Sequence, residues 1–263
     1  MVIRNNQVDV DPFVLNGSGG GISINLPGTG EFNQPYFTSV YLERFAVVDN
    51  VAANVSGGIY TRGVNASSKS DGIVLVNGTI AGNHAIYAGA VFAQGSFAAN
   101  FLTITGNTSD LIVASVDSNF AAGLTVYGTN NSFRNTLIAG NQAGAVTSDC
   151  EVSTIIGSLV SLGYNLIGSS GAGCVISGDT TTNLLNVNPQ LGARTLSASG
   201  MPIYSPAPLS PAVNVIPAAV CADAGGFGVL ADVRGVPRPG IGNAYCDIGA
   251  VETELPLFVS SFE

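Results

Sequence analysis

One pattern decides the fold, and it recurs four times in the first 145 residues: FAVVDN (45–50), GTIAGN (78–83), LTITGN (102–107) and TLIAGN (136–141). Each segment is a short run rich in small or β-branched residues that ends in Asn after Gly or Asp. The asparagines follow one another at intervals of 33, 24 and 34 residues. This interval is typical of repeats in which one supersecondary unit stacks on the next.

A second pattern follows three of these segments: SGGIY (56–60), AGAVF (88–92) and AAGLTVY (121–127). Small residues before an apolar run predict a tight bend and then a new strand. We expect strands of three to five residues at 22–24, 59–61, 90–92 and 124–127. Such short strands favour coils over hairpins or a sandwich. The sequence therefore predicts an all-β fold, namely a parallel β-helix. We expect a right-handed β-helix, because connections between parallel strands are nearly always right-handed.

The repeated asparagines predict an amide ladder at one corner of the stack. Asparagine tolerates the left-handed conformation that a bend requires, and its side chain can donate to the next coil. We expect the turn ladder to consist of Asn50, Asn83, Asn107 and Asn141. A glycan-binding role for these side chains is the less favoured alternative.

Composition excludes several classes of function. Charged residues make up 10% of the 263 residues, the net charge is −9 and Lys69 is the one lysine. A chain without a basic stripe is not expected to bind nucleic acid or anionic membranes. No apolar run reaches the ~20 residues of a transmembrane segment. The first residues do not form a secretory signal, so we expect Met1 to begin a fragment of a longer exported protein.

The four cysteines favour disulfides over free thiols and indicate an extracytoplasmic location, secreted or at the cell surface. Three pairings are open. The pairing of neighbours in sequence, Cys150–Cys174 and Cys221–Cys246, would close two loops of about 25 residues, each stabilising by ~3 kcal/mol in the chain-entropy model.

The C-terminal third does not continue the repeated pattern and contains other motifs. They are GYNLIG (163–168) before Cys174, NLLNVNPQLG (183–192), SPAVNV (210–215) and DVRGVPRP…CDIGAVE (232–252). In this order the motifs resemble exported bacterial β-helix proteins with a "choice-of-anchor" C-terminal region, related in pattern to polymorphic outer-membrane repeat proteins. The resemblance covers about residues 45–252. It implies a right-handed β-helix on an exported, often surface-attached protein, and no single activity. The chain departs from the pattern at Val213-Asn214, where Ile-Asp is expected, and at Val233, where Gln is usual.

We predict four segments: β-helix coils over 1–148, last coils with the Cys150–Cys174 loop over 149–195, a capping region with Cys221–Cys246 over 196–254, and a tail over 255–263 that could be a sorting signal. The capping region concentrates charge in a chain poor in charge, at Asp232, Arg234, Arg238, Asp247 and Glu252. Arginine can bind carboxylates bidentately. We expect a lock that folds the tail over the last coil and covers a sheet edge. An active or metal site is the alternative.

Catalysis is the second hypothesis, because many β-helices act on polysaccharides, although fold alone does not imply function. The candidates for a lyase or glycoside hydrolase are Tyr60, Arg62, Lys69, Asp71, Asp110 and Asp117. A hydrolase needs two carboxylates ~5–10 Å apart, which would require Asp110 or Asp117 to lie near Asp71 or Glu43. His84 is interpreted as a turn residue. No motif for calcium, zinc or phosphate occurs, so no metal and no cofactor is predicted.

The favoured hypothesis is a non-catalytic secreted or cell-surface β-solenoid for adhesion, scaffolding or binding of a polysaccharide or surface glycan. The enzyme is one alternative. A solenoid that self-associates through uncapped coil ends is the other.

Overall fold

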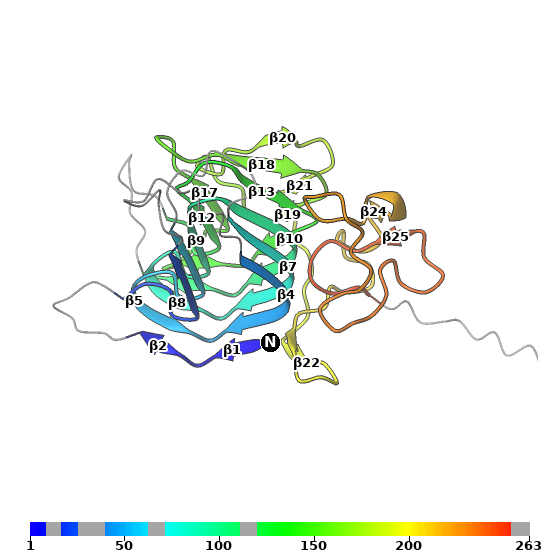
Figure 1. Ribbon diagram of the computed structural model, residues 1–263, viewed down its shortest axis with the longest axis horizontal. Coiled ribbons are helices and arrows are strands. Elements are labelled where there is room, and N and C mark those ends of the chain that lie inside the picture. Colours follow the sequence, from blue (N-terminus) through cyan, green and yellow to red (C-terminus); the bar gives the residue numbers. More distant parts are fainter. Residues whose placement is uncertain (9–16, 26–39, 63–71, 111–119, 254–263) are drawn as a thin grey trace, which may run out of the picture.

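The computed structural model describes residues 1–8, 17–25, 40–62, 72–110 and 120–253, and shows an all-β molecule. Its main body is a stack of coils in which each strand pairs in parallel with the equivalent strands of the neighbouring coils (Figure 1). Three sheets form the faces of the stack. This architecture confirms the predicted parallel β-helix.

Sheet A, the largest, holds ten strands: β1 (Val2–Arg4), β4 (Val40–Val48), β7 (Ile73–Ala81), β10 (Phe97–Thr105), β13 (Asn131–Arg134), β14 (Leu137–Ala139), β18 (Leu159–Leu162), β19 (Leu166–Ile167), β20 (Ser177–Asp179) and β21 (Leu184–Leu185). Sheet B holds β2 (Gln7–Val8), β5 (Val51–Val55), β8 (His84–Tyr87), β11 (Thr108–Ser109), β15 (Gln142–Ala143) and the antiparallel β16 (Val146–Thr147). Sheet C holds β3 (Ile22–Asn25), β6 (Ile59–Arg62), β9 (Val91–Gln94), β12 (Leu124–Val126) and β17 (Cys150–Val152).

The C-terminal region contains little regular structure. Two antiparallel pairs occur in it, β22 (Thr195–Leu196) with β23 (Pro202–Ile203) and β24 (Ile216–Pro217) with β25 (Tyr245–Cys246). The one helical element among the described residues is a single 3-10 turn, η1 (Ala218–Val220). No helix in that part of the chain has the length and apolarity needed to cross a membrane.

Three strands of sheet A are longer than the three to five residues that we predicted. β4, β7 and β10 each contain nine residues, because one left-handed residue bends the strand without ending it. That residue is Arg44, Asn77 or Phe101, with φ of 52°, 50° and 51°. A residue other than glycine adopts this conformation against a steric penalty, so packing must hold it there.

The predicted ladder is present at the corner between sheets A and B. The Nδ2 of Asn50 donates to the Oδ1 of Asn83 at 3.0 Å, Asn83 to Asn107 at 2.9 Å, and Asn107 to Asn141 at 2.8 Å. All four side chains are buried. The ladder extends further than predicted, since Asn6 donates to Asn50 and Asn141 donates to the Oδ1 of Asp149.

The expectation that these asparagines adopt the left-handed conformation is wrong. The residue before each of them does so: Asp49, Gly82, Gly106 and Gly140, with φ between 56° and 74°. Glycine adopts positive φ without a steric penalty, which explains why Gly-Asn recurs in the sequence.

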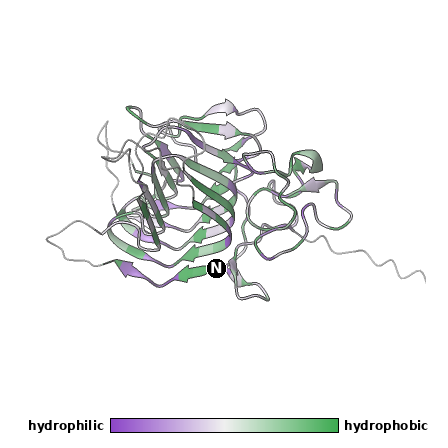
Figure 2. Ribbon diagram, in the orientation of Figure 1, coloured by the Kyte–Doolittle hydropathy of each residue, from purple (hydrophilic) through white to green (hydrophobic). Residues whose placement is uncertain are grey.

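Inward side chains fill the stack with one apolar core. It includes Phe45, Ile59, Leu75, Phe97 and Phe133, each at most 1% exposed. Figure 2 shows the hydrophobic residues following the stacked strands. Because no single coil can bury its own apolar face, the stacking of coils supplies the burial that stabilises the fold.

Both disulfides join the cysteines that are neighbours in the sequence, Cys150 with Cys174 and Cys221 with Cys246, as predicted. The first links β17 to the loop between β19 and β20. The second links the segment after η1 to β25. Disulfides are typical of a protein from an oxidising, extracytoplasmic compartment.

The C-terminal region lies against the outer face of sheet A, on the right of Figure 1, where it is coloured yellow to red. The region packs against Leu166 of β19 and Leu184 of β21 in the last coils, and it extends from there across the face of sheet A to β4. The reason is that the second halves of the sheet A strands carry apolar side chains outward, among them Ala46, Val48 and Leu137. Instead of facing water, Leu137 packs in one cluster with Ile216 and Ile248, and Ala46 and Val48 pack in another with Met201 and Val251.

The left-handed residues of sheet A meet this region directly. Asn77 Nδ2 donates to the carbonyl oxygen of Ala231 at 2.6 Å, and Asn135 Nδ2 donates to that of Ala222 at 3.1 Å. The Phe101 ring lies under the guanidinium of Arg238, 4.3 Å from its centroid. The C-terminal region therefore docks along the bend of the sheet.

The five charged residues of the predicted lock interact with one another inside the C-terminal region. Arg238 Nη1 lies 2.9 Å from Glu252 Oε2, and Arg234 Nε lies 2.8 Å from Asp232 Oδ2. Asp247 Oδ1 accepts from the backbone N–H of Asn214 at 2.7 Å. The charged residues of the lock thus connect parts of the C-terminal region to one another. The region covers a face of the sheet and not a sheet edge.

The buried carboxyl of Asp149 predicts a dependence of stability on pH. Burial raises its pKa above the usual value, although the hydrogen bonds from Asn141 oppose the shift. The folded state then binds the proton more tightly than the unfolded state, whose aspartate has a pKa of about 3.9. Protonation therefore stabilises the fold fully below that pKa, and this contribution is lost as the pH rises through the folded-state pKa.

We expect Asp149→Asn, which cannot titrate and keeps an oxygen for Asn141, to remove this contribution. The difference in urea midpoint between variant and wild type should change between about pH 4 and pH 8 in favour of the variant. Parallel pH profiles for the two proteins would show that Asp149 does not titrate in this range.

Candidate functional site

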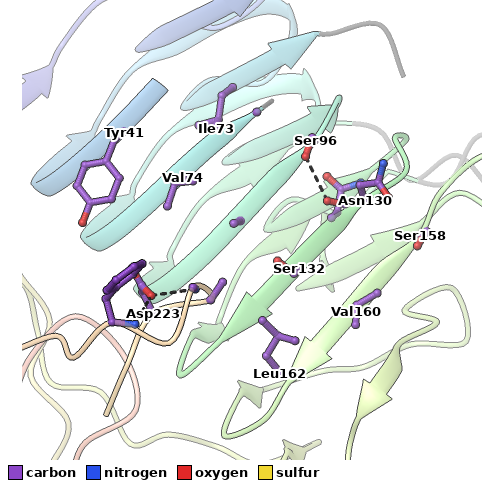
Figure 3. Close-up of a pocket in the computed structure, with 16 residues that line it drawn as sticks. Tyr41, Ile73, Val74, Ser96, Asn130, Ser132, Ser158, Val160, Leu162 and Asp223 are labelled. Carbon is purple, nitrogen blue, oxygen red and sulfur yellow. Dashed lines mark hydrogen bonds between the residues drawn. The ribbon is translucent and has the colours of Figure 1, made fainter. Parts of the chain in front are cut away.

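A groove crosses the outer face of sheet A beside the C-terminal region (Figure 3). Its floor is a row of outward residues from neighbouring strands: Tyr41 pairs in register with Val74, Val74 with Ala98, Ala98 with Ser132, and Ser132 with Val160. Apart from the tyrosine at one end these side chains are small or short. The groove has a volume of about 590 Å³.

One rim of the groove consists of the residues that directly precede four successive strands, and Figure 3 places three of them at the same ends of the strands: Gly72, Ser96, Asn130 and Ser158. The Oγ of Ser96 donates to the carbonyl oxygen of Asn130 at 3.3 Å. A Cβ on Gly72 would lie 2.7 Å from the carbonyl oxygen of Ser96, so close stacking of the coils requires glycine there. The rim repeats polar groups from coil to coil.

The opposite wall is the loop of residues 223–227. Asp223 shapes it, because its Oδ1 accepts from the backbone N–H groups of Gly225 and Phe227 at 2.9 and 3.0 Å. Arg134 Nη1 donates to the Asp223 carbonyl oxygen at 3.3 Å and ties the loop to β13. Phe227 projects from the wall with 75% of its surface exposed.

The electrostatics of the groove are weakly acidic. Asp223 is the one ionised side chain among the described lining residues, and no lysine, arginine or histidine is among them. Partial burial raises the pKa of Tyr41 above its usual value, and the carboxylates of Glu43 and Asp223 raise it further. The Tyr41 hydroxyl therefore stays protonated at neutral pH, and its hydrogen bond to Glu43 contributes to the raised pKa.

The predicted catalytic residues that the structure describes do not meet in one place. Tyr60 and Arg62 lie on β6 of sheet C, whereas Asp110 follows β11 of sheet B. Glu43, the proposed neighbour of Asp110, lies on β4 of sheet A. Three further candidates, Lys69, Asp71 and Asp117, lie outside the described residues.

Tyr60 belongs to an aromatic stack on the outside of sheet C. Its ring lies 5.7 Å from that of Phe92, which lies 5.2 Å from Tyr127. Phe120 continues the stack, 5.5 Å from Tyr127. Because the rings stack on one another from coil to coil, they stabilise the stacking of the coils.

His84 begins strand β8, so its interpretation as a turn residue is wrong. Its Nδ1 lies 2.9 Å from Thr108 Oγ1, and its Nε2 lies 3.5 Å from Asp110 Oδ2. The Asp110 side chain is 61% exposed, and an exposed pair of this kind contributes little to stability.

Within the described ranges, no cluster of three or more His, Cys, Asp or Glu side chains is arranged to hold a metal ion. Comparisons with protein-family models, curated proteins and solved structures found no match to this chain. Inference about its function therefore starts from the groove.

Proposed function

We propose that the protein is a secreted or cell-surface β-helix that binds a glycan in the groove of sheet A without cleaving it. The observation that carries the proposal is the groove itself. Hydroxyl and amide groups line its rim, Tyr41 and Phe227 offer ring faces, and small side chains leave room above the floor. Binding sites for small molecules combine apolar contact surface with a few polar groups in this way.

The non-catalytic part of the proposal rests on the chemistry of the lining. Hydrolysis of a glycosidic bond ordinarily uses two carboxyl groups that face each other across it. The described lining contains one, Asp223, and its Oδ1 already accepts two backbone hydrogen bonds of its own loop. The extracytoplasmic location is supported by the two disulfides and by the resemblance of the C-terminal motifs to exported proteins.

Filling the floor of the groove should abolish most of the binding. We expect Ala98→Leu to weaken the affinity for a bound glycan by about tenfold, since the larger side chain occupies the central position of the floor. Glycans identified in an array screen are titrated against both proteins by calorimetry. The matched control is Gln142→Leu, an outward position on β15 of sheet B.

Equal affinities of Ala98→Leu, Gln142→Leu and wild type would place the binding elsewhere and contradict the proposal. New reducing ends or unsaturated products after incubation with a bound glycan would show that the protein is an enzyme.

A further inference from the structure

We propose that the groove selects neutral glycan chains that lie extended along the axis of the coil stack, and that it discriminates against polyuronides. This inference rests on the proposed function, and it names the class of ligand and its direction.

The charge of the groove argues for a neutral ligand. A polyuronide carries a carboxylate on each sugar, and its recognition calls for cationic partners. The described lining has none, and it contains the carboxylate of Asp223. Arg134 does not line the groove, and its Nη1 donates to the carbonyl oxygen of Asp223. The net charge of −9 adds long-range repulsion.

The repeat of the coils argues for a chain that runs along the stack axis. Ser96, Asn130 and Ser158 occupy equivalent positions of successive coils, and neighbouring strands are separated by about 4.8 Å. The five floor strands span four such steps, about 19 Å, which is roughly the length of four sugar residues in an extended chain. Each coil can thus offer a similar polar group to each sugar.

The two walls of the groove also favour a glycan chain that runs along the stack axis. The rim lies at one end of the strands, and the Asp223 loop lies toward the other, so the open path crosses the strands from Tyr41 toward Val160 (Figure 3). Tyr41 stands at the start of this path and is 54% exposed. Its ring can contact a terminal sugar by stacking, and its hydroxyl oxygen can accept a hydrogen bond while the hydroxyl proton is donated to Glu43.

The test compares the affinities for neutral and acidic oligosaccharides of the same chain length. Neutral probes are the hexasaccharides of cellulose, xylan and mannan, and acidic probes are hexamers of galacturonate and guluronate, all titrated by calorimetry. We expect at least one neutral hexamer to bind at least tenfold more tightly than either acidic hexamer. Affinity for that neutral glycan should rise from the dimer to about the tetramer and then level off.

Two variants change the charge of the groove. Asp223→Asn keeps the oxygen that accepts from Gly225 and Phe227, and Ser132→Lys adds a cation to the floor. We expect both to raise the affinity for the acidic hexamers, Ser132→Lys more strongly and in a salt-sensitive manner. The control is Gln142→Lys on β15, outside the groove, which should leave the affinity for the neutral hexamers unchanged.

The outcomes separate the two proposals. If wild type binds an acidic hexamer as tightly as any neutral one, and Ala98→Leu abolishes that binding, the groove binds glycans but the selectivity inference is wrong. If affinity keeps rising beyond the tetramer or does not depend on length, the extended path is wrong. If none of the hexamers binds but Ala98→Leu weakens the binding of another glycan from the array, the inference is wrong and the proposed function stands; if no glycan binds, both fall.

Discussion

Replacing Arg238 with methionine is expected to lower the free energy of unfolding by about 3–5 kcal/mol. The side chain is fully buried beside Glu252, and it also donates to the backbone carbonyl oxygens of Asp247 and Gly249. Removing one partner leaves the Glu252 carboxylate buried without its counter-charge, which is the destabilising case for buried ion pairs. Urea unfolding followed by circular dichroism measures the loss.

A double-mutant cycle with Glu252→Gln separates the lost charge pair from the lost packing. Glutamine is neutral and keeps an oxygen for the Gly240 N–H that Glu252 Oε1 now accepts at 3.0 Å. The double variant Arg238→Met/Glu252→Gln should therefore be less destabilised than the sum of the two single variants. Strict additivity would show that the pair is not coupled.

The surface pair of Arg194 with Asp49 supplies the control. Arg194 Nη1 lies 2.6 Å from Asp49 Oδ2, but both side chains are more than a third exposed. Solvent screening reduces the value of such a pair to about 0–1 kcal/mol, so Arg194→Met should be far milder than Arg238→Met. Since the loop of the groove belongs to the region that Arg238 holds together, Arg238→Met should also weaken glycan binding.

The corners of the β-helix could be predicted from the sequence because they need particular residue types. A buried amide ladder requires asparagine, and the bend before it favours glycine, so Gly-Asn marks successive coils. The four cysteines likewise indicated disulfides, although three pairings were open. Asn6 and Asp149 escaped prediction, because one lies outside the repeated pattern and the other places a carboxyl where an amide was expected.

The groove could not be read directly from the sequence, because its floor requires only that side chains be small. Val74, Ala98 and Ser132 share no chemical signature and lie in three different coils. A signal does exist once the ladder has aligned the coils. Tyr41, Val74, Ala98 and Ser132 each lie nine residues before a ladder asparagine, and strand alternation then directs them all to one face.

The position of the C-terminal region depends on tertiary packing that no motif announces. Its contacts on sheet A include left-handed residues of the strand bends, among them Asn77, Phe101 and Asn135. These residues lie at equivalent positions but differ in chemistry. The sequence indicated that charged residues would lock the region, and could not indicate which surface the locked region covers.

Breaking the ladder at its middle should have the second large effect on stability. Asn107→Ala removes the oxygen that accepts from both the backbone N–H and the Nδ2 of Asn83, at 3.0 and 2.9 Å. It also removes the Nδ2 that donates to Asn141. The buried backbone N–H of Asn83 then lacks a partner, and the Asn83 Nδ2 keeps only its bond to the carbonyl oxygen of Val47. An unsatisfied buried group costs about 1–3 kcal/mol and the lost ladder bonds add to it, so we expect a loss of about 3 kcal/mol.

Asparagines at the end of the ladder and outside it provide the controls for this prediction. Asn6 lies at the exposed end and only donates to the ladder, so Asn6→Ala leaves no donor of a further coil without a partner. Asn188, whose Oδ1 accepts one exposed backbone bond from Gln190, provides a comparison away from the ladder. We expect both alanine variants to lose less than about 1 kcal/mol in urea unfolding. If Asn107→Ala were as mild as Asn188→Ala, the repeated asparagines would not stabilise the stack, and hydrophobic burial alone would have to hold successive coils together.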